Sequence, residues 1–396
     1  MEQLTGWLTA AEAAERLGVK PATLYAYVSR GVLARRRSPA GQSLFDPTEV
    51  ERLARRGRPR RTTGASEVVI ESGITALGAD RPFYRGRDAL DLAAGASFEE
   101  VAEGLWTGSF TAGRRDWRAG EPALAAGRAA AAALPPNVLP LDRIQAILPA
   151  LAATDPLRGN LDPAAVVDVG RALIGGIVDC LPPAGEPGDT SIAARLAARL
   201  GAEDRFVDGV RTALVLLADH ELAASTLAAR VAASVHADPY AVVATGLATV
   251  SGALHGGASL GAEALLDAVA DPAGADEAIG LRLRRGERIP GFGHAVYKSG
   301  DGRAGVLLNR ITTAAPDHPV LAGANALLAA AARRRLPEPN IDFALATLTR
   351  AAGLPTGSGE AIFAIARIAG WLAHAMEEYE RRTPLRLRAV YIGPAD

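Results

Sequence analysis

The sequence predicts an all-α protein, and three features of its composition support that prediction. Of its 396 residues, 49% are hydrophobic and 22% are charged, as in globular proteins and unlike disordered chains. Alanine, the strongest helix former, occurs 84 times. Aromatic residues, which favour strands, make up only 5%. Since domains contain roughly 100 to 200 residues, the length indicates two or three domains.

The expected compartment is the cytoplasm, and no membrane span is expected. The only cysteine, Cys180, cannot form an internal disulfide, and the chain does not open on a signal peptide. Even the most apolar stretch, 241–253, contains threonine, glycine and serine, so it does not provide the roughly 18 uninterrupted apolar residues that a spanning helix requires.

The net charge of −1 is divided unequally along the chain. Residues 1–62 contain 12 basic and 6 acidic side chains, a balance of +6, so the remaining residues carry −7. A cluster of basic side chains is the electrostatic signature of a nucleic-acid partner. We therefore predict a small basic domain, called the head, joined to a larger acidic part, called the body.

The head is expected to contain two short helices and a two-stranded wing. Thr9 can cap a helix over 9–17, because Glu12 follows at the spacing of a capping box. A second helix over 22–29 follows after a turn, as in a helix-turn-helix. A turn centred on Gly41 then predicts the wing, and a last helix begins within 45–50.

Residues 8–19 and 24–33 resemble the winged helix-turn-helix domains of the MerR and excisionase type. The resemblance implies contact with double-stranded DNA, by side chains near the groove and arginines on the phosphates. The candidates are Tyr25, Tyr27, Arg30, Arg35, Arg36 and Arg37. The alternative is a small structural domain whose arginines form a solvated face.

A polar connector separates the head from the body. Residues 55–66 consist mainly of Arg, Gly, Pro, Thr and Ser, so we place the head at 1–58, a linker at 59–66 and the body at 67–396. Near the start of the body, a weakly alternating stretch and a turn predict a short hairpin. Helical patterns follow from Phe98 onward, interrupted mostly at prolines.

The sequence lacks the patterns of two common kinds of site and of one common fold. The chain has no glycine-rich phosphate loop, no Cys/His cluster with metal-ligand spacing and no regular alternation of strands and helices. These observations argue against nucleotide hydrolysis, a zinc or other metal site, and a doubly wound sheet.

Three of the six histidines lie beside glycine or small residues where helices should begin or end: His220, His255 and His294. Glycine next to the last two allows backbone amides to approach a ligand closely. An imidazole at a helix N-terminus is biased toward its neutral form, which donates a hydrogen bond. We expect these histidines to act as electrophiles. The other three, His236, His318 and His374, are interpreted as structural or exposed.

One carboxylate and several arginines complete the predicted site. Asp342 lies between apolar neighbours just after Pro339, and desolvation there should raise its pKa toward that of a useful general base. Arg303, Arg367 and Arg386 have little acid nearby, and their planar guanidinium groups suit a ligand with two or more carboxylates. The implied reaction is proton abstraction beside a carbonyl, with an anionic co-substrate.

Over roughly 66–394, the chain resembles the citrate synthase family. Short motifs carry the resemblance in the family's order, at 219–221 with 225–226, 254–258, 291–298, 301–303, 339–342, 366–367 with 370–371, and 386–393. The resemblance implies an all-helical homodimer with a large subdomain and a small one, the latter over roughly 258–362. The active site would lie in the cleft between them.

The resemblance also implies a role for each candidate residue. Asp342 would take a methyl proton from acetyl-CoA, His255 would hydrogen-bond the thioester oxygen, and His294 would polarise and protonate the ketone of oxaloacetate. The oxaloacetate carboxylates would be bound by His220, Arg303, Arg367 and, across the dimer, Arg386. Coenzyme A would bind at Ile289, Pro290, Gly291, Phe292 and Gly293. Its thioester is a substrate, and no cofactor is implied.

The chain departs from the family pattern at several uncharged positions. Ala223 and Ala224 stand where the family commonly has Asn, Ser259 replaces another Asn, and 344–346 reads Ala-Leu-Ala in place of Tyr-Ser-Gly. Gly302 and Leu387 each replace a proline that the family commonly has. All the charged catalytic positions are present.

The main prediction is therefore an acyltransferase of the citrate synthase type, which condenses acetyl-CoA with oxaloacetate and hydrolyses citryl-CoA to citrate and CoA. One alternative is 2-methylcitrate synthase, using propionyl-CoA or another short acyl-CoA, because one methylene is worth only about 1 to 3 kcal/mol of discrimination. An alternative of another class is a metabolite-responsive DNA-binding regulator with this body as its sensor.

Overall fold

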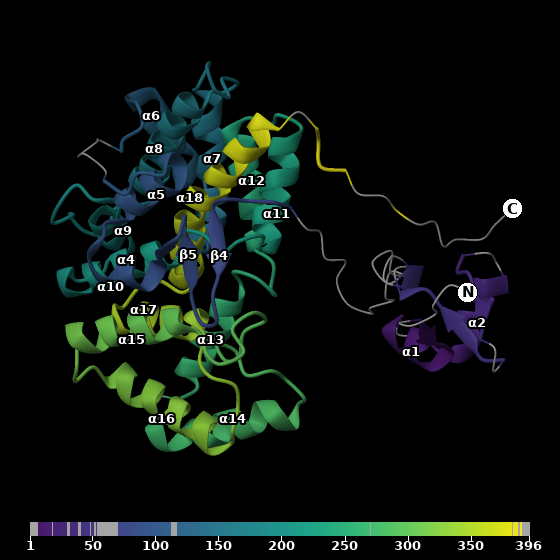
Figure 1. Ribbon diagram of the computed structural model, residues 1–396. Coiled ribbons are helices and arrows are strands. Elements are labelled where there is room, and N and C mark those ends of the chain that lie inside the picture. Colours follow the sequence, from purple (N-terminus) through teal and green to yellow (C-terminus); the bar gives the residue numbers. More distant parts are fainter. Residues whose placement is uncertain are drawn as a thin grey trace, which may run out of the picture. The chain divides into compact units, whose positions relative to one another are not determined.

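The structure is a computed structural model of the chain, which forms two compact units, Met1–Glu71 and Ser72–Asp396 (Figure 1). The two units are described separately. The described residues are 7–17, 19–29, 32–38, 41–47, 49–50, 53, 70–111, 117–269, 271–381, 383–386 and 389.

The first unit is a helix-turn-helix with a wing, as predicted. Its elements are β1 (Leu8–Thr9), α1 (Ala10–Arg16), α2 (Pro21–Ser29), β2 (Arg36–Arg37) and β3 (Ser43–Phe45). The expected capping box is present, because Glu12 accepts from the Thr9 N–H at 2.7 Å and donates its own N–H to the Thr9 hydroxyl. One strand was not anticipated: β1 pairs antiparallel with β3, which gives the sheet order β1-β3-β2.

A small apolar core holds these elements together. It contains Ala13 and Ala14 of α1, Leu24 of α2, and Leu33, Phe45 and Val50. The core explains why two short helices, each marginal alone, are stable as a pair.

Among its described residues, the second unit is helical apart from one isolated β-bridge and three short strands near its start, where a hairpin was predicted. The strands β4 (Thr75–Leu77), β5 (Pro82–Tyr84) and β6 (Arg87–Asp88) pair antiparallel in the order of the sequence. The helices before the predicted site are α4 (Ala89–Gly95), α5 (Phe98–Thr107), α6 (Glu121–Ala132), α7 (Pro140–Ala153), α8 (Pro163–Cys180), α9 (Ile192–Leu200), η1 (Asp204–Phe206) and α10 (Val207–Leu217). The remaining helices are α11 (Ala224–Ser234), α12 (Pro239–Val250), α13 (Ala258–Asp267), η2 (Pro272–Gly274), α14 (Ala275–Arg284), α15 (Gly302–Ala314), α16 (Pro319–Arg333), α17 (Ile341–Ala351) and α18 (Ser358–Glu380).

The long helix α18 is the centre of the larger hydrophobic core (Figure 1). It is buried on nearly every side, as a helix with apolar residues all around requires. Small residues let its neighbours approach closely: a Cβ on Gly246 of α12 would lie 2.5 Å from the Trp371 ring. The Trp106 indole of α5 donates to the Ala369 carbonyl at 2.9 Å.

A second, smaller hydrophobic cluster lies among α13, α14, α16 and one face of α17. Leu265, Ile279, Leu327 and Phe343 represent these four helices in it. Figure 1 draws this group in green below the larger one. The helix α15 carries Ala304, Leu307 and Ile311, which belong to the larger core. The loops that join the two clusters carry the predicted site.

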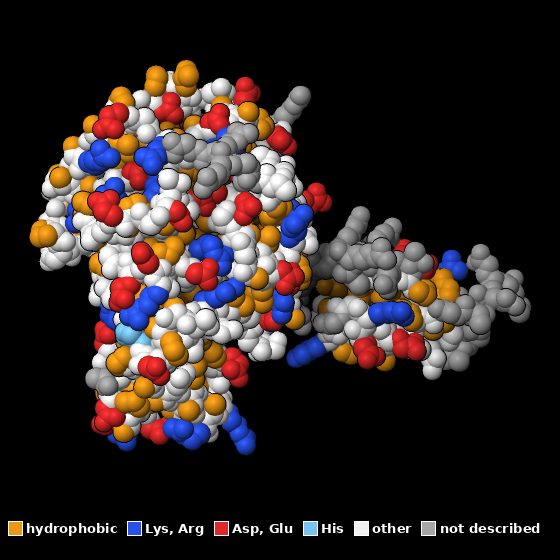
Figure 2. All heavy atoms as spheres, turned by 90° about the vertical axis from the view of Figure 1, so that its left-hand side faces the viewer, with side chains coloured by type: hydrophobic (Ala, Val, Ile, Leu, Met, Phe, Trp, Pro, Cys, Tyr) orange, Lys and Arg blue, Asp and Glu red, His pale blue; other side chains and the backbone are white. Residues whose placement is uncertain are grey.

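Two further observations concern the surface and the helix lengths. On the face seen in Figure 2, acidic and basic side chains of the body are interspersed, and neither sign of charge dominates. Within the described ranges, no helix combines the length and apolarity that a membrane crossing requires.

Candidate active site

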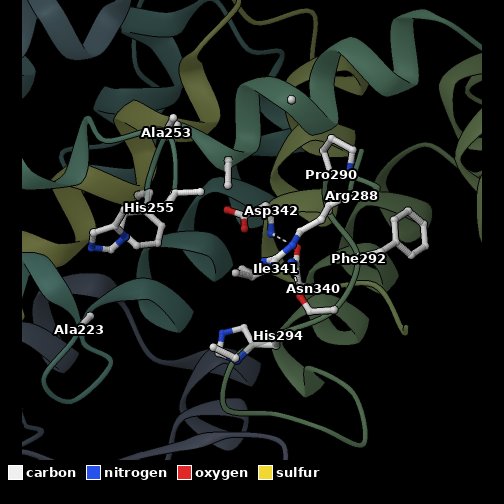
Figure 3. Close-up of a pocket in the computed structure, with 18 of the residues that line it drawn as sticks. Ala223, Ala253, His255, Arg288, Pro290, Phe292, His294, Asn340, Ile341 and Asp342 are labelled. Atoms are coloured by element: carbon white, nitrogen blue, oxygen red, sulfur yellow. Dashed lines mark hydrogen bonds between the residues drawn. The ribbon is translucent and has the colours of Figure 1, made fainter. Parts of the chain in front are cut away.

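A cavity of about 560 Å³ lies where loops from the two clusters meet. The three predicted histidines, Asp342, Arg303, Arg367 and the segment 289–293 all line it. In Figure 3, His255 and His294 lie on different sides of the pocket, and the Asp342 carboxylate points into the space between them. Residues more than 100 positions apart in the sequence are thus collected into one site.

Asp342 lies in the first turn of α17, and its position is fixed by the preceding residue. Asn340 caps the helix, because its side-chain oxygen accepts from the Asp342 N–H at 3.0 Å. Its amide nitrogen donates to the Gly293 carbonyl at 2.8 Å, which joins α17 to the loop before His294. Burial raises the pKa of the Asp342 carboxyl to about 7, although Arg303 lowers it in part. This carboxylate is therefore a base matched to neutral pH.

His255 lies in the turn between α12 and α13. Its Nε2 is 2.8 Å from the Ser225 hydroxyl, and that hydroxyl oxygen accepts from the Trp371 indole at 3.3 Å. The Ser225 proton is therefore free to be donated to Nε2, which leaves the ring proton on Nδ1. Burial, and secondarily Arg367, lower the pKa of His255 to about 4, so the ring is neutral at pH 7. We assign it as a neutral donor through Nδ1.

His294 is held in the opposite tautomer by its own loop. Its Nδ1 accepts from the backbone N–H groups of Val296 and Tyr297, at 3.0 and 3.1 Å. Because Nδ1 is an acceptor, the neutral ring carries its proton on Nε2. The Arg303 Nη2 atom lies 3.4 Å from Nε2, and a guanidinium cannot accept a hydrogen bond, so in this tautomer the Nε2–H is left to donate to a ligand. Burial and then Arg303 lower the pKa of His294 to about 4. The site therefore contains two neutral imidazoles that donate hydrogen bonds.

Positive charge gathers on one side of the pocket. Arg303 is buried and pairs with Asp301 through two hydrogen bonds of 2.9 Å. Arg367 is also buried, and it donates Nε to the Leu217 carbonyl at 2.9 Å. Its Nη1 atom is buried with no hydrogen-bond partner, and among the described residues Arg367 forms no ion pair. A buried guanidinium of this kind favours an anionic ligand.

His220 and Tyr297 lie beside these arginines. The His220 Nε2 atom is 2.9 Å from the Tyr297 hydroxyl, and its ring lies edge-on to that of His294, with centroids 5.4 Å apart. Burial, followed by Arg303 and Arg367, lowers the pKa of His220 well below its usual value. His220 is therefore neutral and can donate to an anion without adding charge.

The segment 289–293 needs its glycines. Gly291 and Gly293 have φ of +80° and +79°, in the left-handed region. A Cβ on Gly291 would lie 2.8 Å from Cβ of Phe343, so the loop approaches α17 too closely for any side chain. The Asn340 N–H donates to the Gly291 carbonyl at 2.9 Å, which fixes the loop.

The remaining candidates are Arg386, which follows the end of α18, and six residues of the head. Arg386 is exposed and does not line the cavity of its own chain. In the head, Tyr25 is 41% exposed, Arg35 and Arg37 are exposed, and Tyr27 packs against the small core. Arg36 is exposed and lies over the Trp7 ring at 5.2 Å. Arg30 lies outside the described residues.

Sequence reasoning assigned no role to several residues that shape the site. Ser225 orients His255, Tyr297 contacts His220, and Phe363 lies edge-on to the His255 ring. Arg288 lines the pocket next to the segment 289–293 (Figure 3). Ser225 and Tyr297 lie within motifs, and Phe363 and Arg288 lie close to one, but only the fold shows what each of them contacts.

This arrangement can remove a proton from carbon and stabilise the resulting charge. A carboxylate base faces two neutral donors, and buried arginines lie beside them. Among the described residues, no group of three His, Cys, Asp or Glu side chains has the geometry of a metal site.

The chain is similar to citrate synthases in sequence and structure. Residues 64–388 match the family described as citrate synthase, C-terminal domain, and residues 7–58 match a helix-turn-helix domain. Citrate synthase 2 of Bacillus subtilis is 30% identical over 358 residues, covering 83% of this chain and 94% of its own. The 2-methylcitrate synthase of Mycobacterium tuberculosis is also 30% identical, over 393 residues, covering 92% of this chain and 97% of its own. A solved ternary complex of Thermoplasma acidophilum citrate synthase with carboxymethyl coenzyme A and oxaloacetate has a TM-score of 0.71 and 29% identity, covering 83% of this chain and 95% of that one.

Proposed function

The chain belongs to the citrate synthase family of acyltransferases, and from that premise we propose that its pocket condenses acetyl-CoA with oxaloacetate and hydrolyses the product to citrate and CoA. One observation carries the proposal. A carboxylate whose pKa is about 7 faces two neutral imidazoles, with two buried arginines beside them.

The first step is enolisation of the acyl thioester. Asp342 removes a proton from the methyl carbon, and the Nδ1–H of His255 donates to the thioester oxygen as charge builds there. A neutral donor suits this task, because the N–H of a neutral imidazole is a weak acid that can stabilise the enolate oxygen by a hydrogen bond. Each such donor is worth about 3 to 4 kcal/mol by analogy with other oxyanion sites.

The second step forms the carbon–carbon bond. The enol carbon attacks the ketone of oxaloacetate, and the ketone oxygen takes a proton from the Nε2–H of His294. Arg303 and Arg367 hold the carboxylates, and His220 donates to the same ligand. In this proposal the two histidines have their protons on different nitrogens, and each donates to a different substrate. Water then cleaves the thioester, which releases CoA and citrate.

We also propose that the chain is a homodimer and that the partner subunit's Arg386 completes each oxaloacetate site. Two features support this. Val231 of α11 and Val235, which follows its last residue, are 47% and 66% exposed, which suits an apolar interface. Arg386 follows the end of α18 and is exposed, so it is available to another chain. The proposed compartment is the cytoplasm, where the lone and buried Cys180 would stay reduced.

Propionyl-CoA is the alternative acyl donor. The pocket wall near His255 includes Ala223, Ala253 and Ala258, whose side chains end at Cβ. Such a wall leaves room for an additional methylene, and the similarity to a 2-methylcitrate synthase favours the same alternative. Comparing rates with acetyl, propionyl and butyryl thioesters measures this preference.

A second proposed activity belongs to the head, where the helix-turn-helix match covers residues 7–58. We propose that it binds double-stranded DNA through α2 and the arginines of the wing, as a regulator that responds to the ligands of the body. Replacing Arg35, Arg36 and Arg37 by alanine should weaken binding of a promoter fragment and reduce its salt dependence. Binding that is equal for random DNA and unaffected by oxaloacetate or acyl-CoA would contradict this activity.

The condensation is tested by release of free thiol from acetyl-CoA. We expect release only when oxaloacetate is present, and Asp342→Asn should slow it about 10²- to 10⁴-fold, as expected for loss of a general base. Oxaloacetate should still bind to this variant, because Arg303 and Arg367 remain. Asp162→Asn, at an exposed helix cap outside the pocket, is the matched control. Wild-type protein without thiol release above background would refute the proposed function.

A further inference from the structure

A fully buried polar network lies behind the oxaloacetate side of the pocket. Asp219, Arg230, His374 and Glu378 are each 0% exposed, and none of them lines the cavity. They come from the loop before α11, from α11 and from the last turns of α18. The chemistry proposed above uses none of these groups, so their cost of burial needs another explanation.

The network ends at the residue next to His220. The Asp219 Oδ2 atom accepts from the Glu221 N–H at 3.0 Å and lies 3.3 Å from His374 Nε2. Glu221 has φ of +53°, which is uncommon for any residue other than glycine. The Asp219 carboxylate thus fixes a strained turn, and the middle residue of that turn is His220.

The direction of the hydrogen bonds follows from Arg230. Its guanidinium is always protonated, so at 2.6 Å it donates Nη1–H to His374 Nδ1. The His374 proton is therefore on Nε2 and is donated to Asp219. Arg230 is itself held by Glu378, at 2.7 Å from Nε, and by Glu377, at 2.7 Å from Nη1. Glu377 in turn accepts from the Gly73 N–H at 2.8 Å.

The helix α18 leaves space for the Asp219 carboxylate. A Cβ on Gly370 would lie 2.2 Å from Asp219 Oδ1, so glycine is required there. One turn later, His374 presents its ring to the other oxygen. Arg367, one turn earlier, donates to the carbonyl of Leu217, the last residue of α10 and two residues before Asp219. One helix therefore supplies both an arginine of the pocket and the support for His220.

We propose that His374 and Asp219 are positioning residues for oxaloacetate: they hold the His220 turn in place without touching the substrate. This inference rests on the proposed function, because it concerns the affinity for one of the two substrates. His220 Nε2 lies 2.9 Å from the Tyr297 hydroxyl, so a displaced turn would remove a donor from the pocket and disturb Tyr297. The acyl-CoA side, at His255, is held by other side chains of the same two helices, Ser225 of α11 and Trp371 of α18.

Two amide substitutions at position 374 separate the contacts of the imidazole. A glutamine places its amide nitrogen near the position of Nε2, so His374→Gln keeps the donor to Asp219. An asparagine is one methylene shorter and places its amide near Nδ1, so His374→Asn keeps the contact with Arg230 and loses Asp219. Both side chains are polar and smaller than or similar to histidine, which makes them a matched pair.

The test compares KM for the two substrates in both variants. We expect His374→Asn to raise KM for oxaloacetate about 10- to 100-fold, the effect of losing a hydrogen bond to a charged group. KM for acyl-CoA should stay within about twofold, and His374→Gln should stay within about threefold of wild type for both substrates. Equal effects of the two variants, or a parallel rise of both KM values, would overturn the proposal.

A second substitution tests the role of the strained turn. In Glu221→Gly the left-handed conformation no longer needs the Asp219 hydrogen bond. His374→Asn on that background should raise KM for oxaloacetate less than about threefold, because coupled residues are not additive. A full loss of affinity on both backgrounds would overturn the proposal. Inactive wild-type protein would refute the proposed function instead, so the two failures are distinguishable.

Discussion

The pKa of Asp342 is the property of a single residue on which the proposed chemistry depends most. Burial raises it, Arg303 lowers it in part, and Asp301 raises it again, to about 7. Desolvation therefore outweighs the nearby guanidinium, which is itself neutralised by the paired Asp301 carboxylate. An aspartate in water would be too weak a base for a carbon acid.

This pKa predicts the pH dependence of the reaction. Asp342 must be ionised to accept a proton, and a raised pKa means that it is protonated below about pH 7. The value of kcat/KM for acyl-CoA should therefore fall about tenfold per pH unit below this point. His255 and His294, with pKa values of about 4, stay neutral and add no step between pH 5 and 8. A rate profile that is flat over this range would contradict the assignment of the base.

Several residues of the site could be predicted before the structure was known. Glycine beside His255 and His294, and apolar residues around Asp342, indicated neutral donors and a desolvated base, and the local environments have these properties. The tautomers could not be predicted, because Ser225 and Trp371 are distant in sequence from His255 and only the fold brings them together. His374 was interpreted as structural or exposed, and it is fully buried beside Asp219.

The ends of the helices determine which residues come together in the site. The cap Asn340, the loop 289–293 and the first turn of α17 form one unit, linked by hydrogen bonds of 2.8 to 3.0 Å. The positions of prolines and glycines in the sequence indicated where these helices would end. The pairing of Phe292 with Pro339 in a β-bridge had no sequence signal, because it depends on how two distant segments meet.

Gly291→Ala tests the close approach within this unit. The substitution combines a left-handed φ with a clash against Phe343, so the loop should shift and KM for acyl-CoA should rise about tenfold or more, because overpacking costs about 1 to 3 kcal/mol. Gly286→Ala is the control, since Gly286 also has a positive φ, +71°, but no atom would lie within 4 Å of its Cβ. If KM for acyl-CoA rose equally in both variants, the left-handed backbone conformation alone, and not the contact with Phe343, would account for the effect.

Gly302 illustrates how a departure from a family pattern becomes understandable in the fold. Its N–H donates to the Asp80 carbonyl at 2.9 Å, in the turn between β4 and β5. Proline, which the family commonly has there, cannot make this hydrogen bond. The hairpin thus supports the start of α15, the helix that carries Arg303.

In the proposed dimer, each pocket needs a residue from the second subunit. Arg386 is exposed on its own chain, whereas Arg303 and Arg367 are buried in the pocket. The composition indicated the all-helical fold and the separate basic head, because alanine content and charge segregation are properties of the chain itself. Which residues reach across to a partner is a property of the assembly.

Mixed dimers test this claim. Arg386→Ala and Asp342→Asn proteins should each be nearly inactive, because each lacks one group from every pocket. When equal amounts are refolded together, half of the dimers are mixed and each has one intact pocket, so about one quarter of wild-type activity should return. No recovery would mean that Arg386 acts in its own subunit, and an Arg386→Ala protein with wild-type activity would mean that it has no role in the site.

Carbon–carbon bond formation is the step that defines the proposed function, and it can be observed directly. Acetyl-CoA labelled with carbon-13 in its methyl group is incubated with oxaloacetate and the wild-type protein, and the products are followed by NMR. We expect the label to move into a methylene carbon of citrate while an equal amount of free CoA appears. Label that stays in intact acetyl-CoA, or that is released as acetate, would contradict the proposed condensation.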